Sequence, residues 1–274
     1  MPFKLYIDSR FRKDVGGTGN TDSDFSIELP HPIKVKGKAF CDVFMCPNTF
    51  LTVRTGENDR IYMRENGVDM ICVVAPGQYQ AFSLQTAVQD ALNANSVLVG
   101  SYQVNRNPTK NVLVMYNNDT NLQSFSIFSS KYLKENPSAW TGSTLNLDNL
   151  MSIENVLGYG TTNQILTGGN QNNALEVPGA INTQAYNQLF LRSDLGLGYD
   201  AIGPDGSSDI IRRVVCQAAQ NDMIVDMHSL PTDHITIGDR QISSLSFKLT
   251  DVHGRVVDTL GHPISFSVIF AEED

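Results

Sequence analysis

Two stretches of the sequence, SLSFKLT (244–250) and PISFSVIF (263–270), decide the fold class. In both, apolar residues alternate with small or polar ones at a period of two, which predicts strands that bury one face. The stretch DFSIEL (24–29) repeats this alternation. We expect the strands at 244–250 and 263–270 to pair as a hairpin, because Gly254 and Gly261 in the intervening link suit turns.

Outward from these stretches, short strand-like segments separated by turn residues follow one another along most of the chain. They are KAFCDVFM (38–45), DRIYMR (59–64), VDMICVV (68–74), SYQV (101–104), NVLVMY (111–116), SFSIF (124–128), NQLFLR (187–192), DIIRRVVCQ (209–217), DMIVDM (222–227) and HITIG (234–238). Such spacing is typical of sandwiches and barrels, and about eight strands suffice for a jelly roll. We therefore predict an all-β protein: a single jelly-roll β-sandwich with two short helices and long loop insertions.

Two segments carry apolar residues at helical spacing instead. In the first, Ser83 is placed to cap a helix whose apolar residues recur from Leu84 to Leu92. The second runs over residues 147–157, where Gly158 is positioned to end it. We expect both helices to cover an end of the sandwich.

Polar, glycine-bearing stretches set the expected domain organisation. Residues 8–24 and 158–184 are rich in Gly, Asn, Thr, Asp and Gln and are too polar for a core. We predict an N-terminal arm (1–24), a jelly-roll sandwich formed by residues 25–130 and 213–274, and an insertion of elaborated loops at one end of the sandwich (131–212).

Charge narrows the choice of partners. The 274-residue chain has a formal net charge of -9 and a pI near 5.0, so its average field repels phosphate backbones and anionic headgroups. Lys34, Lys36 and Lys38 form the one local basic group, which we interpret as a solvated strand edge. The sequence does not begin with the charged residues and apolar run of a signal peptide. It also has no stretch of about 18 apolar residues, the length of a membrane span. We expect no secretory leader, no membrane insertion and no specific nucleic-acid partner.

The four cysteines, Cys41, Cys46, Cys72 and Cys216, lie inside apolar runs. A free thiol in such a run behaves as a small hydrophobe, so we predict buried, reduced cysteines, which suits a protein made in a reducing cytosol. The spacing of Cys41 and Cys46 is odd, which places them on opposite faces of one strand, where they cannot pair.

No motif predicts catalysis. GLGYDA (196–201) matches the GxGxxA dinucleotide fingerprint, but residues 202–206 break the helix that has to follow it. Three aspartates within 222–233 lie near His228 and His234, yet their spacing does not resemble a calcium loop, and we interpret them as solvated carboxylates. We predict no enzyme activity, no catalytic residue, no cofactor and no metal.

One alternative function is a carbohydrate- or receptor-binding β-sandwich module. The single tryptophan, Trp140, lies in a Pro-Ser-Ala-Trp-Thr-Gly turn, where an aromatic face can stack on a sugar. Trp140 is therefore the candidate glycan contact.

The two ends of the chain resemble a known family. The segments LYIDSRFR (5–12), DFSIELP (24–30) and VFMCPNT (43–49), with LSFKLTD (245–251) and GHPISFSVIF (261–270), are similar to the opening and closing segments of the minor capsid, or penton, proteins of virophages and Polinton-like viruses.

This resemblance implies a jelly roll standing roughly perpendicular to a capsid surface, in a homopentamer at the five-fold vertex of an icosahedral particle. The implied partners are the chain itself, the major capsid protein and a host surface receptor, and the implied location is the virion, after synthesis in the host cytoplasm. Tyr6, Arg10 and Arg12 suit an assembly arm that reaches a neighbouring subunit, and an ordinary first strand with a solvated tail is the alternative. Ring closure requires different patches that meet head to tail.

Overall fold

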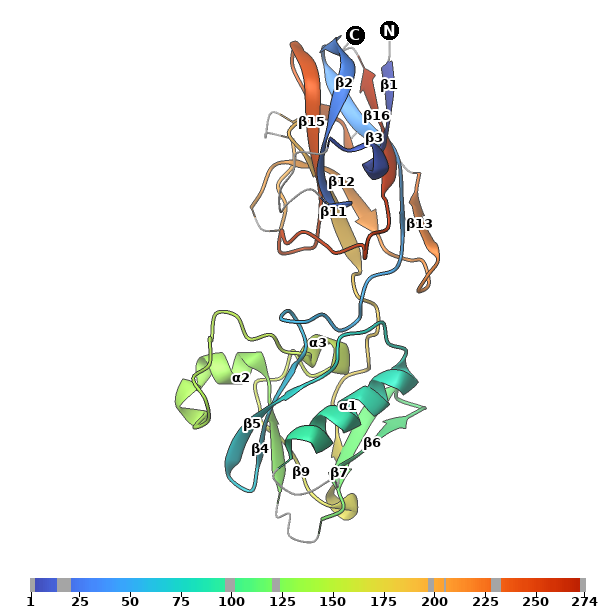
Figure 1. The fold of residues 1–274 in the computed structure, drawn as a ribbon. Helices are drawn as coiled ribbons and strands as arrows, with labels where there is room; N and C mark the ends of the chain where they lie inside the picture. Colours follow the sequence, from blue (N-terminus) through green and yellow to red (C-terminus); the bar gives the residue numbers. More distant parts are fainter. Residues whose placement is uncertain are drawn as a thin grey trace. The chain divides into compact units, whose positions relative to one another are not determined.

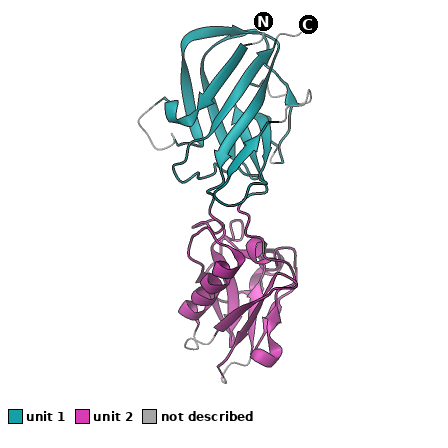
Figure 2. Ribbon diagram, turned by 90° about the vertical axis from the view of Figure 1, so that its right-hand side faces the viewer, with its two compact units in different colours: residues 1–50, 186–274 teal, residues 51–185 magenta. Residues whose placement is uncertain are grey.

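The structure is a computed structural model that describes residues 3–13, 21–96, 102–119, 124–196, 200–204, 206–227 and 233–271. The chain divides into two compact units, the first formed by residues 1–50 and 186–274 and the second by residues 51–185 (Figure 2). The second unit is therefore an insertion into the first. No helix in the described ranges is long and apolar enough to cross a bilayer.

Two antiparallel sheets build the first unit (Figure 1). Sheet A has the strand order β1 (Phe3–Asp8), β16 (Ser265–Ala271), β3 (Lys38–Pro47) and β13 (Met223–Asp226), and β14 (Ile235–Thr236) also pairs with β3. Sheet B has the order β12 (Ile210–Val215), β11 (Gln188–Ser193), β15 (Arg240–Thr250) and β2 (Asp24–Val35). A short 3-10 helix, η1 (Ser9–Phe11), follows β1.

The strand order is that of a jelly roll. Along the chain, β1, β3, β13 and β16 join sheet A, while β2, β11, β12 and β15 join sheet B, so the chain passes repeatedly from one sheet to the other. This interleaving of the two sheets is the jelly-roll arrangement of two Greek keys, with β14 as an additional short strand on β3. It leaves β1 and β2 at one edge of the sandwich and β12 and β13 at the other. The predicted all-β jelly-roll fold is confirmed.

The predicted hairpin between the strands at 244–250 and 263–270 is wrong. β15 pairs with β2 and β11, whereas β16 pairs with β1 and β3. The two strands face each other across the core instead, where the ring centroids of Phe247 and Phe266 lie 4.9 Å apart. Each strand has an apolar face that pairing within one sheet would leave uncovered, and packing the two sheets face to face buries both.

The cysteines are buried and free, as predicted. The expectation that Cys41 and Cys46 lie on opposite faces is wrong. Val43 pairs with Ser267, while Cys41 pairs with the next residue of β16, Val268, so β3 holds one extra residue between them. This β-bulge shifts the alternation by one position and returns both thiols to the buried face.

The described part of residues 1–24 contains a strand and a corner rather than a free arm. β1 pairs with β16 along its whole length at the edge of sheet A. Residues 1, 2 and 14–20 of the expected arm lie outside the described residues. Residues 3–8 are therefore a first strand of sheet A, and their contact with a neighbouring subunit stays a prediction.

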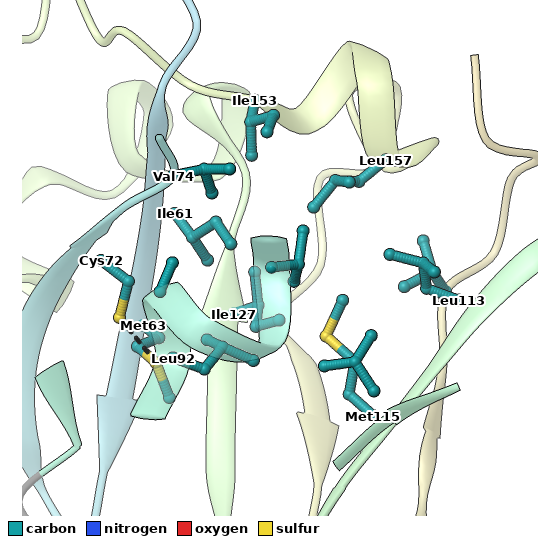
Figure 3. Close-up of a cluster of buried hydrophobic side chains, with 14 of the residues drawn as sticks. Ile61, Met63, Cys72, Val74, Leu92, Leu113, Met115, Ile127, Ile153 and Leu157 are labelled. Carbon is teal, nitrogen blue, oxygen red and sulfur yellow. Dashed lines mark hydrogen bonds between the residues drawn. The ribbon is translucent and has the colours of Figure 1, made fainter. Parts of the chain in front are cut away.

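Two smaller sheets and several short helices build the second unit. One sheet has the order β5 (Val68–Val73), β4 (Arg60–Glu65), β8 (Phe125–Phe128) and β9 (Leu166–Gly168), and the other has the order β10 (Leu175–Glu176), β7 (Val112–Asn117) and β6 (Tyr102–Asn107). The helices are α1 (Ala81–Asn95), α2 (Ser130–Glu135), η2 (Pro137–Ala139), α3 (Glu154–Leu157) and η3 (Gln171–Asn173). Side chains from both sheets, α1 and α3 meet in one closed core, as Figure 3 shows for Met63, Leu92, Met115 and Leu157.

The domain boundaries differ from the expected ones. The strands between residues 51 and 130, which we expected in the sandwich, form the sheets of the second unit. The expected insertion, 131–212, includes β11, which lies in the middle of sheet B. Alternation identifies a strand and its buried face, but it does not say which sheet the strand joins.

Both predicted helices belong to the second unit and not to an end of the jelly roll. α1 begins at Ala81, so Ser83 lies inside its first turn, where the hydroxyl accepts a hydrogen bond from the backbone N–H of Gln80 (3.1 Å). The second helix is shorter than expected, because only Glu154–Leu157 is helical, and Gly158 ends it with a φ of 88°.

Candidate interaction surface

Large exposed hydrophobic side chains gather at the two edges of the first unit. At the edge formed by β1 and β2 (the β1–β2 edge), Tyr6 is 77% and Phe11 is 80% exposed. Near the opposite edge (the β12–β13 edge), Met223, Met227 and Ile202 are 55%, 63% and 84% exposed. Single exposed hydrophobics are ordinary, but groups of them mark surfaces that contact another molecule.

A groove of about 540 Å³ lies along the β1–β2 edge. Its lining includes Leu5, Tyr6, Phe11, Ile27, Leu29 and Phe266. In the described ranges neither β1 nor β2 has a second strand as neighbour. A strand edge of this kind, beside an apolar groove, favours contact with another chain.

Hydrogen bonds within the chain hold the corner at η1. The buried hydroxyl of Ser9 donates to the carboxylate of Asp22 (3.0 Å) and accepts from the backbone N–H of Ile264 (3.1 Å). Arg12 donates to the same carboxylate oxygen (2.7 Å). The corner is fixed while the side chain of Phe11 stays in solvent.

Charged side chains of β1 and η1 are paired within the chain. Arg10 donates to both carboxylate oxygens of Asp8, at 2.9 and 2.7 Å, and this hydrogen bonding lowers the pKa of Asp8. Lys4 donates to Asp42 at 2.5 Å, which raises the pKa of Lys4. Of the predicted arm residues, Tyr6 faces solvent, whereas both arginines bind carboxylates of their own chain. Their role in assembly stays a prediction.

Arg212 joins the two sheets at the β12–β13 edge. Its guanidinium donates to both oxygens of Asp226 (3.1 and 2.5 Å) and to Asp233 (3.0 Å), and its side chain is 5% exposed. Burial is the largest single influence and disfavours the charge, but the hydrogen bonds to Asp226 together with the charges of Asp226 and Asp233 raise the pKa of Arg212. Two of the three aspartates weighed as cation ligands are therefore paired with Arg212, and His228 lies outside the described residues. No group of three or more His, Cys, Asp or Glu side chains in the described ranges could hold a metal ion.

The outer faces of the two sheets differ in chemistry. On the outer face of sheet A, apolar side chains lie on β1, β3 and β13 (Tyr6, Val43, Met45, Met223 and Val225), and the register places Ser267 of β16 between Tyr6 and Val43. The strand register places Met45 directly beside Val225. On the outer face of sheet B the hydroxyls of Ser26 and Ser246 are hydrogen-bonded at 3.0 Å, and Val215 of β12 is an exposed apolar side chain. Sheet A therefore exposes more apolar side chains than sheet B.

Trp140, the candidate glycan contact, lies in the second unit. Its ring is edge-on to Tyr62 and Phe128, with centroids 5.8 and 5.9 Å away, and its Nε1 donates to the carbonyl of Ser143 (2.8 Å). These contacts give the half-buried ring a structural role, and the glycan contact stays a prediction. In the GxGxxA stretch, residues 197–199 lie outside the described residues.

Comparison with known proteins shows a similarity in fold to solved structures. No protein-family model matches the sequence, and no curated protein is similar to it. The fold is similar to the crystal structure of the selenomethionine-labelled mavirus penton protein, with a TM-score of 0.54 and 9% sequence identity over 100% of both chains. At this identity the similarity shows a shared fold, and that fold includes both units.

Proposed function

We propose that this chain is a structural capsid protein whose copies assemble into a homopentamer at the five-fold vertex of an icosahedral particle. The main observation behind the proposal is that the jelly roll exposes apolar side chains at two opposite edges. A closed ring of identical copies needs two different surface patches on each copy, and the two edges supply them. The fold shared with a penton protein along the whole chain adds support.

The proposal includes a location and partners. The chain belongs to the virion, after synthesis in the host cytoplasm, and its neighbours beyond the pentamer are copies of the major capsid protein. A host surface receptor is a further partner, since a vertex is exposed to the host cell. With a net charge of -9, the chain as a whole repels nucleic acid, which fits a shell protein better than a genome-binding one.

Native mass spectrometry of the purified full chain, with negative-stain electron microscopy, tests the proposal. We expect a species of five times the 30.2 kDa subunit mass and ring-shaped particles with five-fold symmetry. A chain that stays monomeric over the whole concentration range, and that is absent from purified particles, would contradict it.

A further inference from the structure

We infer that the subunit contact is edge to edge and head to tail, so that the β12–β13 edge of one copy docks on the groove at the β1–β2 edge of the next. This inference rests on the proposed function, because it names the surfaces through which that assembly is made. The occupant of the groove is therefore a second copy of this chain.

The apolar side chains at the two edges complement each other in kind. The groove is walled by branched and aromatic side chains, including Leu5, Leu29 and Phe266. The opposite edge presents two exposed methionines, Met223 and Met227. A methionine side chain is unbranched and flexible, so it fills irregular apolar gaps well. The β12–β13 edge therefore supplies side chains that fit into a groove, and the β1–β2 edge supplies the groove.

Charge favours this pairing over contact between two identical edges. The described residues at the β1–β2 edge (3–13 and 21–35) carry five basic and four acidic side chains. The described residues around β12 and β13 (200–204, 206–227 and 233–236) carry five acidic side chains and two arginines. Two β12–β13 edges would therefore repel each other, whereas a β12–β13 edge meets nearly balanced charges at the β1–β2 edge and is not repelled there. Contacts between unlike edges can close into a ring.

Variants at each edge test this arrangement in the full chain. Tyr6→Glu/Phe11→Glu places charge at the groove, and Met223→Glu/Met227→Glu places charge at the opposite edge. All four side chains are largely exposed, so thermal unfolding should match the wild type. Phe82→Glu in the second unit is the matched control, because Phe82 is also largely exposed. In sedimentation velocity and native mass spectrometry we expect both double variants to be monomers and the control to assemble like the wild type.

Mixing the two double variants gives the decisive result. Each variant keeps one intact edge, so a 1:1 mixture should form a heterodimer and nothing larger, since the remaining edges are blocked. Monomers in the mixture would overturn the edge-to-edge contact. Double variants that assemble like the wild type would also overturn it and leave the proposed pentamer standing. A wild-type chain that never assembles would defeat the proposed function and this inference together.

Cross-linking gives an independent readout. The native thiols are buried, so a short bismaleimide should react only with introduced cysteines. For Phe11→Cys/Met227→Cys we expect covalent oligomers up to the pentamer, because each copy then joins two neighbours. Each single variant should remain monomeric under denaturing conditions. A double variant that gives only monomers or dimers would contradict head-to-tail contact.

Discussion

The two units differ in where they place their hydrophobic side chains and how they bury charge. The first unit has exposed aromatic and methionine side chains at both sandwich edges, and it buries Arg212 between two aspartates. The second unit closes its sheets over α1, and its buried Glu65 accepts a hydrogen bond from the phenol of Tyr102 (2.9 Å). Similar short alternating strands therefore build both a sandwich with apolar side chains exposed at its edges and a unit whose two sheets and α1 share one core.

The largest loss of stability should come from Gly158→Ala, which adds a single methyl group in the second unit. Gly158 has a φ of 88°, and a Cβ there would overlap the carbonyl oxygen of Gly179. We expect Gly158→Ala to unfold the second unit, at a cost of at least about 3 kcal/mol, because both backbone segments have to move. The fluorescence of Trp140, the single tryptophan, reports this unit in urea titrations.

Gly67→Ala is the control for this prediction. Gly67 has nearly the same φ, 83°, but a Cβ there would have nothing within 4 Å. Gly67→Ala should therefore lower the unfolding free energy by only roughly 1–2 kcal/mol, which is the cost of a side chain on a residue in the left-handed region. Equal losses in Gly158→Ala and Gly67→Ala would show that the close approach of Gly158 and Gly179 is unimportant.

The next largest effect should fall on the first unit. Arg212→Met leaves Asp226 and Asp233 without their buried cation, which we expect to cost about 3–5 kcal/mol of unfolding free energy. Arg213→Met, at the exposed neighbouring position, should cost no more than about 0.5 kcal/mol. The reactivity of buried thiols toward a maleimide, followed in urea, measures both variants. Similar losses would mean that Arg212 does not hold this edge together.

A smaller effect should follow from Trp140→Ala. We expect a loss of about 2 kcal/mol, less than for a fully buried tryptophan, because the half-buried ring loses its contacts with Tyr62 and Phe128. Thermal unfolding checks the loss, and a glycan array checks the alternative function. A variant of unchanged stability that no longer binds a glycan bound by the wild type would favour the sugar-stacking role instead.

Much of the fold could be predicted from the sequence, because burial imposes local patterns. The alternation in 244–250 and 263–270 predicts real strands, and the apolar spacing from Leu84 to Leu92 predicts α1. The pairing could not be predicted, because alternation is the same whichever partner a strand has. The bulge in β3 could not be predicted either, since nothing in KAFCDVFM marks Asp42 as an extra residue.

The candidate surface was harder to predict than the fold. Tyr6 was predicted because it lies in LYIDSRFR (5–12), a segment similar to the opening of the penton proteins. Met223 and Met227 lie in a stretch with the alternation of any strand, and the sequence does not indicate that they are exposed. The pairing of Arg212 with Asp226 and Asp233 joins residues from separate strands and loops, so the sequence indicated solvated carboxylates where the structure pairs two of the three with a buried arginine.

The smallest effect per residue is the loss of stability when the cysteine thiols ionise. It should give the two units different dependences of stability on pH. Burial raises the pKa of each cysteine from 9.0 to about 12. Above pH 9 the unfolded chain loses these protons while the folded chain keeps them, so stability is fully present below pH 9 and falls as pH rises toward 12. Each thiol should lower the unfolding free energy by up to about 1.4 kcal/mol per pH unit. The first unit holds three of the four thiols and the second holds Cys72, so near pH 9 the first unit should lose stability more steeply. Burial also raises the pKa of Tyr62, Tyr79, Tyr102 and Tyr159 in the second unit, so the difference between the two slopes narrows as pH approaches 10. Urea titrations measure the two slopes, with labelling of Cys41, Cys46 and Cys216 followed by peptide mass spectrometry for the first unit and Trp140 fluorescence for the second. Equal slopes near pH 9 would contradict the assignment.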